Sequence, residues 1–476
     1  MIKKLSGAAA PLRICAAQVE IDETNPEATE ARRARAVEKA LDDGAAFAAI
    51  GGEAGRYEDD DVIIVTDDAT FAAGARPKRL AELARQAAAA GKPLVYVGSN
   101  GVRDGGKAIR VLDGGSCAFA PDGTRADLLP RFGEGAVTFD IPGVFAGATA
   151  APACDEGFDA VTEAVRHGTR AFLARLGIGR VVVGISGGID SAVTAALYGS
   201  ILKPEDLLLV AMPGPFTSQT TRGLSHKLAA NLGARFAEIP IGEAVDLTCR
   251  QFAELRSEGP GGGIAGAWEL SSFAVENVQA RDRGARVLAA AAAAFGGVVS
   301  CNANKAEVTV GYGTLHGDIL GWLSCLGDLW KGEVYALGRH LNEKVFGRDV
   351  IPEGIFQVKP SAELSASQDV EKGLGDPLNY PYHDKLFAYW VEAGATPDDC
   401  LRRFDDGSLA AAIGYDGDLT AVFPDAKAFR ADLCRWWNQY KGLAVAKRLQ
   451  APPVLAVSRR AFGEFPEIQS ARRLAV

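Results

Sequence analysis

The chain has 476 residues, which predicts two or three domains, and its 48% hydrophobic and 23% charged residues are typical of a soluble globular protein. A formal net charge of −9 argues against a nucleic-acid surface as the main function. The eight cysteines form no Cys-x-x-Cys pair, the N-terminal residues are too weakly apolar for a signal peptide and no apolar run reaches membrane-spanning length, so we expect a soluble, cytoplasmic protein without a zinc or thiol-redox motif.

The first third of the chain predicts an α/β layered domain, because predicted strands alternate with helices and a hairpin. In chain order, the predicted elements are a strand at 12–21, a helix at 25–43, a strand at 46–50, a helix at 76–91, a strand at 93–98 and a strand pair at 111–123 with turns at Gly114 and at Asp122-Gly123.

Parts of this region resemble the nitrilase-type amidohydrolase fold. The matching segments are Cys15-Ala-Ala-Gln18, Tyr96-Val-Gly98 and Asp113-Gly-Gly-Ser116 with Ala120-Pro-Asp-Gly123, and the resemblance covers residues 10 to 142. It implies that residues 1–142 form a shortened nitrilase-like domain. In that family a cysteine attacks an amide, a glutamate acts as the base and a lysine stabilises the oxyanion.

The catalytic residues of that family are largely unmatched in this chain. Glu53, in Ile-Gly-Gly-Glu-Ala-Gly, is the only candidate, and the segment that would carry the lysine and the cysteine is missing. We interpret Cys15 and Cys117 as buried structural thiols. We therefore assign no glutaminase nucleophile, and we expect a domain without glutaminase activity that serves packing, oligomerisation or regulation.

A short segment separates this domain from the rest of the chain. Residues 139–152 are small, spaced by prolines and nearly uncharged, which is typical of a linker, and we place the linker at 143–154. A helix is predicted from Asp155 to Leu176. We expect residues 155–476 to form the second domain.

The stretch from Val181 to Ser191, Val-Val-Val-Gly-Ile-Ser-Gly-Gly-Ile-Asp-Ser, predicts a phosphate-binding turn. A buried strand is followed by Ser186-Gly187-Gly188 and then by a helix, so that backbone N–H groups and the helix dipole favour an anion there. The turn lacks the lysine of a Walker loop and the Gly-x-Gly-x-x-Gly of a dinucleotide fold. Because a carboxylate beside phosphates needs a cation between them, we interpret Asp190 as a magnesium ligand. The alternative is that Asp190 and Ser191 only cap the helix.

Two further repeats of strand and helix predict a parallel, doubly wound sheet. Their strands are expected at 207–212 and 235–241. Ligands bind at the carboxyl ends of the strands in such sheets, so the turn at Met212 would face the same crevice as Ser186. Ser218 or Thr217 would contact adenosine, or else cap the following helix.

Two later segments carry further candidates for the same site. A long helix from 270 to 295 places Asn277, Arg281 and Gly284 on one face. The strand that ends at Ser300 is followed by a polar cluster, and Glu307 lies near the start of the next element. A second carboxylate is what a pyrophosphate-bound magnesium would need opposite Asp190.

These motifs resemble an enzyme superfamily and one family within it. The string Ser186-Gly-Gly-Ile-Asp-Ser191 resembles the loop of the N-type ATP pyrophosphatases, which cleave ATP between the α- and β-phosphates. The other motifs, in their order, resemble NAD synthetase in its glutamine-dependent subtype, over residues 155 to 465. They are Glu276 to Gly284, Asn304-Lys-Ala-Glu307, Gly311-Tyr-Gly-Thr314, Gly317-Asp318, Gly327-Asp-x-x-Lys331, Lys359 to Leu364, Gln368 and Ala451 to Gly463.

The resemblance implies a set of site residues. The catalytic residues would be Asp190, Glu307 and Lys331, with Asp190 and Glu307 holding Mg²⁺. ATP would contact Gly184, Ile185, Ser186, Gly187, Gly188, Ile189, Asp190, Ser191, Met212, Ser218 and Asn302. Deamido-NAD would contact Asn277, Arg281, Asp318 and Lys331. Cys301-Asn302 stand where the family usually has Gly-Thr, so the role of Asn302 stays open.

The implied enzyme is a ligase that forms a C–N bond. It would adenylate the carboxylate of nicotinic acid adenine dinucleotide (deamido-NAD) with ATP, and ammonia would then displace AMP to give NAD. We expect free ammonia as the nitrogen source, with a separate glutaminase as a possible partner, and a homodimer or larger homo-oligomer without nucleic-acid or membrane partners. The alternatives are a glutamine-dependent NAD synthetase with a functional or partner-supplied glutaminase, another pyrophosphatase-loop amidotransferase, and a non-enzymatic nucleotide sensor.

Overall fold

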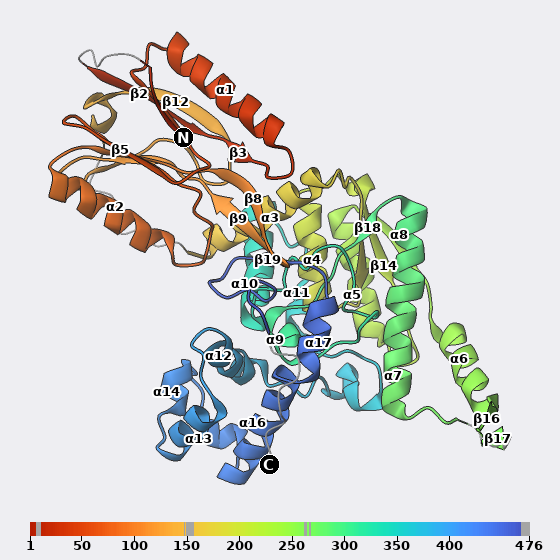
Figure 1. Ribbon diagram of the computed structural model, residues 1–476. Coiled ribbons are helices and arrows are strands. Elements are labelled where there is room, and N and C mark those ends of the chain that lie inside the picture. The colour runs from red at the N-terminus through yellow and green to blue at the C-terminus, as the bar shows by residue number, and fades with distance from the viewer. Residues whose placement is uncertain (6–10, 147, 149–156, 261–263, 266–267, 468–476) are drawn as a thin grey trace. The chain divides into compact units, whose positions relative to one another are not determined.

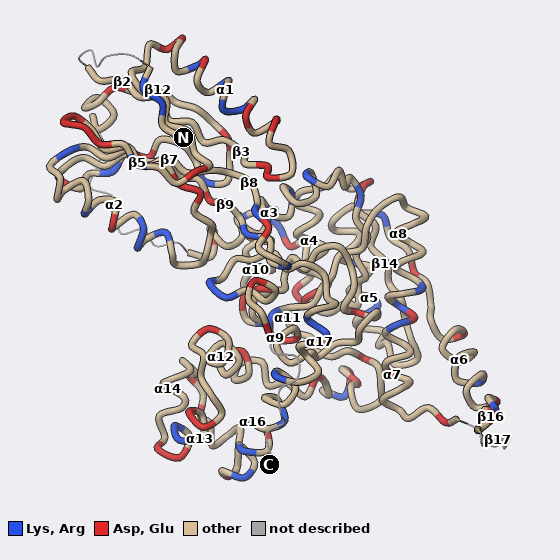
Figure 2. The backbone as a smooth tube through the Cα atoms, in the orientation of Figure 1, with Lys and Arg blue, Asp and Glu red and all other residues tan. Residues whose placement is uncertain are grey.

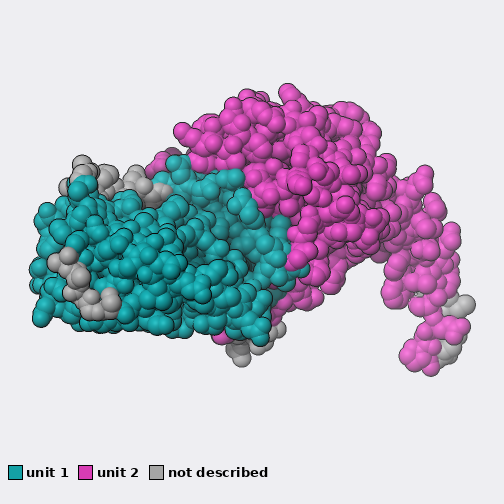
Figure 3. All heavy atoms as spheres, turned by 90° about the horizontal axis from the view of Figure 1, so that it is seen from above, with its two compact units in different colours: residues 1–176, 455–459 teal, residues 177–454, 460–476 magenta. Residues whose placement is uncertain are grey.

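A computed structural model describes residues 1–5, 11–146, 148, 157–260, 264–265 and 268–467 (Figure 1). The chain divides into two compact units, residues 1–176 with 455–459 and residues 177–454 with 460–476 (Figure 3). Residues 147 and 149–154 of the expected linker lie outside the described residues. The predicted helix that follows is α3, Gly157–Arg175, which belongs to the first unit. The domain limits expected from the sequence stay a prediction.

The first unit contains two main sheets, and a helix packs on one face of each. The first sheet has the order β1 (Ile2–Lys4), β4 (Phe47–Ile50), β2 (Leu12–Gln18) and β12 (Gly135–Ile141). The second has the order β11 (Arg125–Asp127), β10 (Cys117–Phe119), β7 (Leu94–Val97), β6 (Ile63–Thr66) and β5 (Gly55–Glu58). Helix α1 (Pro26–Asp42) packs on the first sheet and α2 (Arg76–Ala90) on the second.

Alternation along the strands explains this four-layer arrangement. In β2, Ile14 and Ala16 join a core shared with the second sheet, whereas Cys15 and Ala17 face the core beneath α1. Successive side chains of a strand point to opposite faces, so both faces of this strand are buried. Along α1, acidic and basic residues are interspersed in the chain (Figure 2), in contrast to the basic stripe of a nucleic-acid interface.

The sequence predicted that two strands within 111–123 pair with each other, and this prediction is wrong. Strand β9 (Ala108–Asp113) pairs with β8 (Asn100–Gly105), which in turn pairs with β3 (Glu20–Ile21) in a third sheet. Strand β10 instead pairs with β7 and, across the predicted turn at Gly123, with β11. The left-handed φ of +55° at Gly114 redirects the chain from one sheet to the other.

The second unit is built on a four-stranded parallel sheet, which confirms the predicted α/β class. Its order is β15 (Arg235–Glu238), β14 (Leu207–Ala211), β13 (Val181–Ile185) and β18 (Val298–Val299). The chain proceeds from β13 to β14 and β15 on one side and returns to β18 on the other. The strand order therefore reverses beside β13, and such a switch point opens a crevice at the carboxyl ends of the strands.

The rest of the second unit is mainly helical. The long helix predicted at 270–295 consists of α7 (Ser272–Arg281), a π-helical turn (Asp282–Leu288) and α8 (Ala289–Phe295). None of the helices in the described part of the chain combines the length and apolarity needed to cross a bilayer. The other α-helices and strands of the second unit are α4 (Ile189–Gly199), α5 (Gln219–Leu232), α6 (Gly242–Glu254), β16 (Ser257–Glu258), β17 (Ile264–Ala265), α9 (Lys305–Val310), α10 (Lys331–His340), α11 (Glu353–Gln357), α12 (Tyr380–Val391), α13 (Pro397–Asp405), α14 (Leu409–Ile413), α15 (Leu419–Val422), α16 (Ala426–Tyr440) and α17 (Leu443–Gln450). Strand β19 (Val454–Ala456) has its last two residues in the first unit.

Candidate active site

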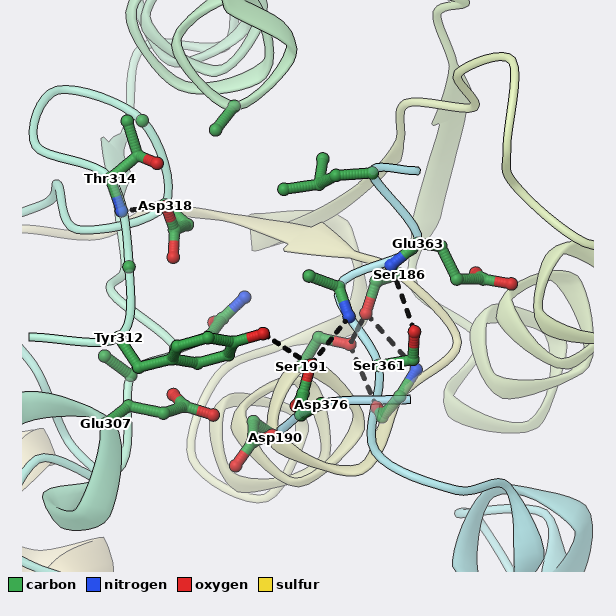
Figure 4. Close-up of a pocket in the computed structure, with 18 of the residues that line it drawn as sticks. Ser186, Asp190, Ser191, Glu307, Tyr312, Thr314, Asp318, Ser361, Glu363 and Asp376 are labelled. Atoms are coloured by element: carbon green, nitrogen blue, oxygen red, sulfur yellow. Dashed lines mark hydrogen bonds between the residues drawn. The ribbon is translucent and has the colours of Figure 1, made fainter. Parts of the chain in front are cut away.

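The glycine turn between β13 and α4 has a tightly fixed backbone. Gly187 has a φ of +83°, and a Cβ atom there would lie 2.2 Å from the carbonyl oxygen of Thr221, so only glycine fits. The Ser191 hydroxyl accepts a hydrogen bond from the N–H of Ser186 at 3.2 Å and donates one to the carbonyl of Gly188 at 3.1 Å. Figure 4 shows both serines at the turn.

The N-terminus of α4 is left open toward this turn. Gly188 is its N-cap residue, and no side chain caps the free N–H groups of the first turn. The Asp190 carboxylate is directed to other partners, so the capping alternative does not describe its role. An uncapped helix N-terminus offers N–H donors and a partial positive charge to an anion.

Asp190, Glu307 and Lys331 form a cluster beside the turn. The Lys331 Nζ atom lies 2.5 Å from Oδ2 of Asp190 and 3.3 Å from Oε1 of Glu307. The other oxygen of Asp190 accepts a hydrogen bond from the side-chain amide of Asn304 at 2.9 Å. Asn304 also forms a reciprocal capping box with Glu307 at the start of α9, which fixes the direction of that carboxylate.

Burial and mutual charge control the protonation of this cluster. Burial raises the pKa of Glu307 to about 8, and the Asp190 carboxylate adds to this increase while the Lys331 ammonium opposes it. Burial alone would lower the pKa of Lys331, but the two carboxylates outweigh burial and raise it. The lysine is therefore a permanent cation, and Glu307 is the group whose charge responds near neutral pH.

Asp376 forms a second acidic position that the sequence analysis missed. Its Oδ1 atom accepts a hydrogen bond from the Tyr312 hydroxyl at 3.0 Å (Figure 4), and its Oδ2 atom accepts one from the Tyr380 hydroxyl at 3.1 Å. Burial raises the pKa of Asp376, and the Lys331 ammonium and the tyrosine hydroxyls oppose this increase. No regular spacing joins Asp376 to the other acidic residues, so only the fold could reveal it.

The side chain of Asn302 lies close to the carboxyl end of β13. Its Nδ2 atom donates to the carbonyl of Gly184 at 2.8 Å, whereas its Oδ1 atom is buried without a hydrogen-bond partner among the described residues. Met212 lies on the other side of Gly184, and its carbonyl accepts from the Arg283 guanidinium at 3.0 Å. These residues line the wall of the crevice next to the phosphate-binding turn.

Asn277 and Asp318 are held together at another part of the crevice. Thr314 donates its hydroxyl proton to Oδ1 of Asn277 at 2.9 Å and its backbone N–H to Asp318 at 2.7 Å. Burial raises the pKa of Asp318, and the backbone hydrogen bonds oppose this. A Cβ atom on Gly284 would lie 2.0 Å from the carbonyl of Gly317, so this glycine lets the helix approach the loop closely.

A cavity of about 500 Å³ in the second unit joins these parts. It is lined by all of the predicted site residues except Gly187, Ser218 and Arg281. Ser218 caps α5, since its hydroxyl accepts from the N–H of Thr221 at 3.1 Å. Arg281 is exposed, and the neighbouring arginine that lines the cavity is Arg283, whose pKa burial lowers to about 10. Thr217, the alternative to Ser218, does line the cavity.

The candidates for a glutaminase site lie apart from one another in the first unit. Cys15 in β2 and Cys117 in β10 are fully buried beneath different helices. Burial raises the pKa of both thiols, to about 12 for Cys117. Glu53 is exposed and lies 3.5 Å from Arg33. Because the thiolate is the nucleophilic form, burial of this kind opposes reactivity.

Comparison with known proteins agrees with this geometry. Residues 161–408 match the family model described as NAD synthase. The chain is 30% identical to the glutamine-dependent NAD(+) synthetase of Xanthomonas campestris over 407 residues, which are 85% of this chain and 66% of that protein. It is 29% identical to that of Synechocystis over 374 residues, 78% of this chain and 59% of that protein.

A solved structure covers both units. The glutamine-dependent NAD+ synthetase from Acinetobacter baumannii, in complex with adenosine diphosphate, has a TM-score of 0.53 and 25% identity, covering 84% of this chain and 66% of that one. The chain thus spans 59% and 66% of the length of the two curated relatives.

Proposed function

The chain belongs to the NAD synthase family, and from that premise we propose that it adenylates the carboxylate of deamido-NAD with ATP and then lets ammonia displace AMP, giving NAD and pyrophosphate. The observation that carries the proposal is one cavity that holds the open N-terminus of α4, the Asp190, Glu307 and Lys331 cluster, and the Asn277 and Asp318 pair. Such a cavity places a site suited to phosphate groups and a second polar site side by side.

The charges in the cavity suit the first step. A carboxylate that attacks the α-phosphorus is repelled by the phosphate oxygens, and this repulsion is reduced by positive groups placed where negative charge develops. The N–H groups at the α4 N-terminus and the Lys331 ammonium supply such groups. No general base is needed, because the attacking carboxylate is already ionised at neutral pH.

Asp190 and Glu307 fit a magnesium ion. Mg²⁺ prefers oxygen ligands and is commonly held by one or two carboxylates together with substrate phosphates. The described residues contain no group of three or more side chains that could hold a metal ion by themselves, so the phosphates would complete the coordination. When bound, the ion would neutralise phosphate charge. Burial raises the pKa of Glu307, and a cation beside this carboxyl would favour its ionised form.

We propose free ammonia as the nitrogen source, with a separate glutaminase as a possible supplier. The separation and burial of Cys15 and Cys117 support this proposal. At neutral pH most ammonia is present as ammonium, which must lose a proton before the nitrogen can attack the adenylated carboxylate.

The test is an assay for NAD, AMP and pyrophosphate with purified protein, deamido-NAD and MgATP, comparing ammonium with glutamine. We expect all three products with ammonium and none with glutamine. Asp190→Asn should abolish product formation, whereas Asp398→Asn, an exposed aspartate on α13, should not. AMP release without deamido-NAD would contradict the proposed reaction. Glutamine-dependent turnover lost on Cys15→Ala or Cys117→Ala would contradict the proposed nitrogen source alone.

Two further parts of the proposal concern assembly and compartment. Leu247, Trp268 and Phe273 are exposed apolar side chains of the second unit, which supports a homodimer or larger homo-oligomer. Light scattering after size exclusion would measure the mass of the assembly. Seven cysteines of the described residues are free, which supports a reducing compartment such as the cytoplasm.

A further inference from the structure

A second cavity, of about 640 Å³, lies entirely within the first unit. One wall is the face of α3 that carries Glu163, His167 and Arg170, at helical spacings of four and three residues. The other wall is the segment from Arg125 to Phe132, together with Arg76 at the start of α2. A cavity of this size matches the pockets that take small organic ligands.

Four arginines and three acidic residues line the cavity, and two of the arginines have no acidic partner among the described residues. Arg125 is paired with Asp127 at 3.0 Å, and Arg131 lies 3.3 Å from Asp113. Arg76 is only 6% exposed, yet its hydrogen bonds go to two carbonyl oxygens, those of Gly114 and Gly115. No described carboxylate lies within 4 Å of its guanidinium or of that of Arg170. A buried cation without a counter-charge is costly, so an anion in the cavity would reduce the cost of burying the Arg76 guanidinium.

Phe132 and His167 meet at the same cavity in an unusual arrangement. Phe132 has a φ of +55°, a left-handed conformation that is strained for an aromatic residue, and its ring centre lies 5.7 Å from that of His167. The Nε2 atom of His167 is buried and has no hydrogen-bond partner among the described residues. Burial lowers the pKa of His167 to about 4, so the ring is neutral in the empty cavity. Strain of this kind clusters at ligand-binding positions.

We propose that this cavity is a second ligand site, which binds a small organic anion through a carboxylate or phosphate group held by Arg76 and Arg170. Guanidinium groups present paired N–H donors that match both kinds of oxyanion. The rings of Phe132 and His167, with Leu128 and Pro130, would contact the less polar part of the ligand. The site gives the first unit a ligand-binding role that requires no glutaminase chemistry.

Histidine NMR signals of the full chain test the proposal. The chain has five histidines, and His167 is the only one that lines either of the two cavities described. With ¹³C-labelled histidine, the ring signal of His167 is the one lost in His167→Gln. Inorganic phosphate and citrate are titrated separately at constant pH and ionic strength. We expect a saturable shift of the His167 signal, while the other four signals serve as internal references.

Two variants distinguish a specific anion-binding site from nonspecific attraction of anions by positive charge. Arg170→Ala should weaken the titration about tenfold or more, because a charged hydrogen-bond donor is removed. Arg170 is exposed, so the fold should be kept. Arg35→Ala, which removes an exposed arginine on α1, should leave the titration unchanged. A response to phosphate alone or to citrate alone would identify the preferred group. The proposal is overturned if neither anion shifts the signal, or if Arg35→Ala weakens binding as much as Arg170→Ala.

Discussion

The Lys331 ammonium lies 2.5 Å from Oδ2 of Asp190, although 141 positions separate the two residues in the chain. Asp190 is on the first turn of α4, and Lys331 begins α10. The two helices pack on each other, so the contact depends on the fold of the second unit and not on a local motif. The same ammonium also reaches Glu307, which makes Lys331 the central cation of the proposed site.

Lys331→Met should lower kcat for NAD formation about a hundredfold or more, because a positive group is lost from where the phosphates carry charge. The assay is NAD formation with ammonium at saturating substrates, and circular dichroism confirms folding. Lys344→Met, at an exposed lysine just after α10, is the matched control and should keep full activity. If both variants lost activity equally, Lys331 would have no specific role in the proposed active site.

Stability without ligands should fall between about pH 5 and pH 8 because of Glu307. Its pKa is raised from 4.5 to about 8 in the folded state, so the folded protein holds a proton that the unfolded chain has lost in that range. The proton bound to Glu307 therefore stabilises the folded protein, and this stabilisation is complete below the pKa that Glu307 has in the unfolded chain. It is lost as the pH rises through the pKa that Glu307 has in the folded protein.

Glu307→Gln tests this pH dependence, since it should flatten the fall in melting temperature between pH 5 and pH 8. Glu254→Gln, an exposed glutamate at the end of α6, should keep the slope of the unaltered protein. Magnesium with ATP should also reduce the slope, because a cation lowers the pKa of a neighbouring carboxyl. An unchanged slope in Glu307→Gln would assign the pH dependence to another group.

Gly187→Ala should destabilise the protein by about 1–3 kcal/mol or more, because alanine is strained at a φ of +83° and its Cβ atom meets the Thr221 carbonyl. Gly223→Ala is the control. Gly223 lies inside α5 with no atom within 4 Å of the added Cβ, and alanine there should stabilise by about 0.5–1 kcal/mol. Thermal unfolding of the two variants should therefore shift in opposite directions.

Ser218→Ala should lower stability by about 1 kcal/mol, since it removes the N-cap of α5. The KM for ATP should stay unchanged, because Ser218 does not line the cavity. Steady-state kinetics and thermal unfolding of the same preparation measure the two effects. A raised KM with unchanged stability would restore the sequence-based assignment of Ser218 to ATP binding.

Local patterns predicted the turn at Ser186 to Gly188 and the parallel sheet around it, because both follow from strand and helix periods and from glycine conformation. The meeting of Asp190 with Glu307 was expected because a pyrophosphate-bound magnesium would need a second carboxylate, and the structure places both in one cavity. Asp376 could not be found this way, because its partner Tyr312 lies 64 positions away in the chain.

Residue spacing along a helix also predicts only approximately which side chains face a cavity. It placed Arg281 on the same face as Asn277, whereas the cavity is lined by Asn277, Ala280 and Gly284, with Arg283 beside them. Residue 281 lies at the edge of that face, and a π-helical turn begins at Asp282. An ideal period of 3.6 residues does not predict such a change in the helix.

The side chain of Glu363 is buried, and the backbone φ of this residue is +47°. Its carboxylate accepts hydrogen bonds from the N–H of Ser218 at 3.1 Å and from the hydroxyl of Thr221 at 2.7 Å. The positive end of the α5 dipole is thus already satisfied by a carboxylate from the protein itself. The N-terminus of α4, in contrast, has no side-chain cap and stays open to the crevice. Of these two helix ends, only that of α4 is left for phosphate groups in the proposed complex, so Glu363 would favour one orientation of the triphosphate by occupying the other end.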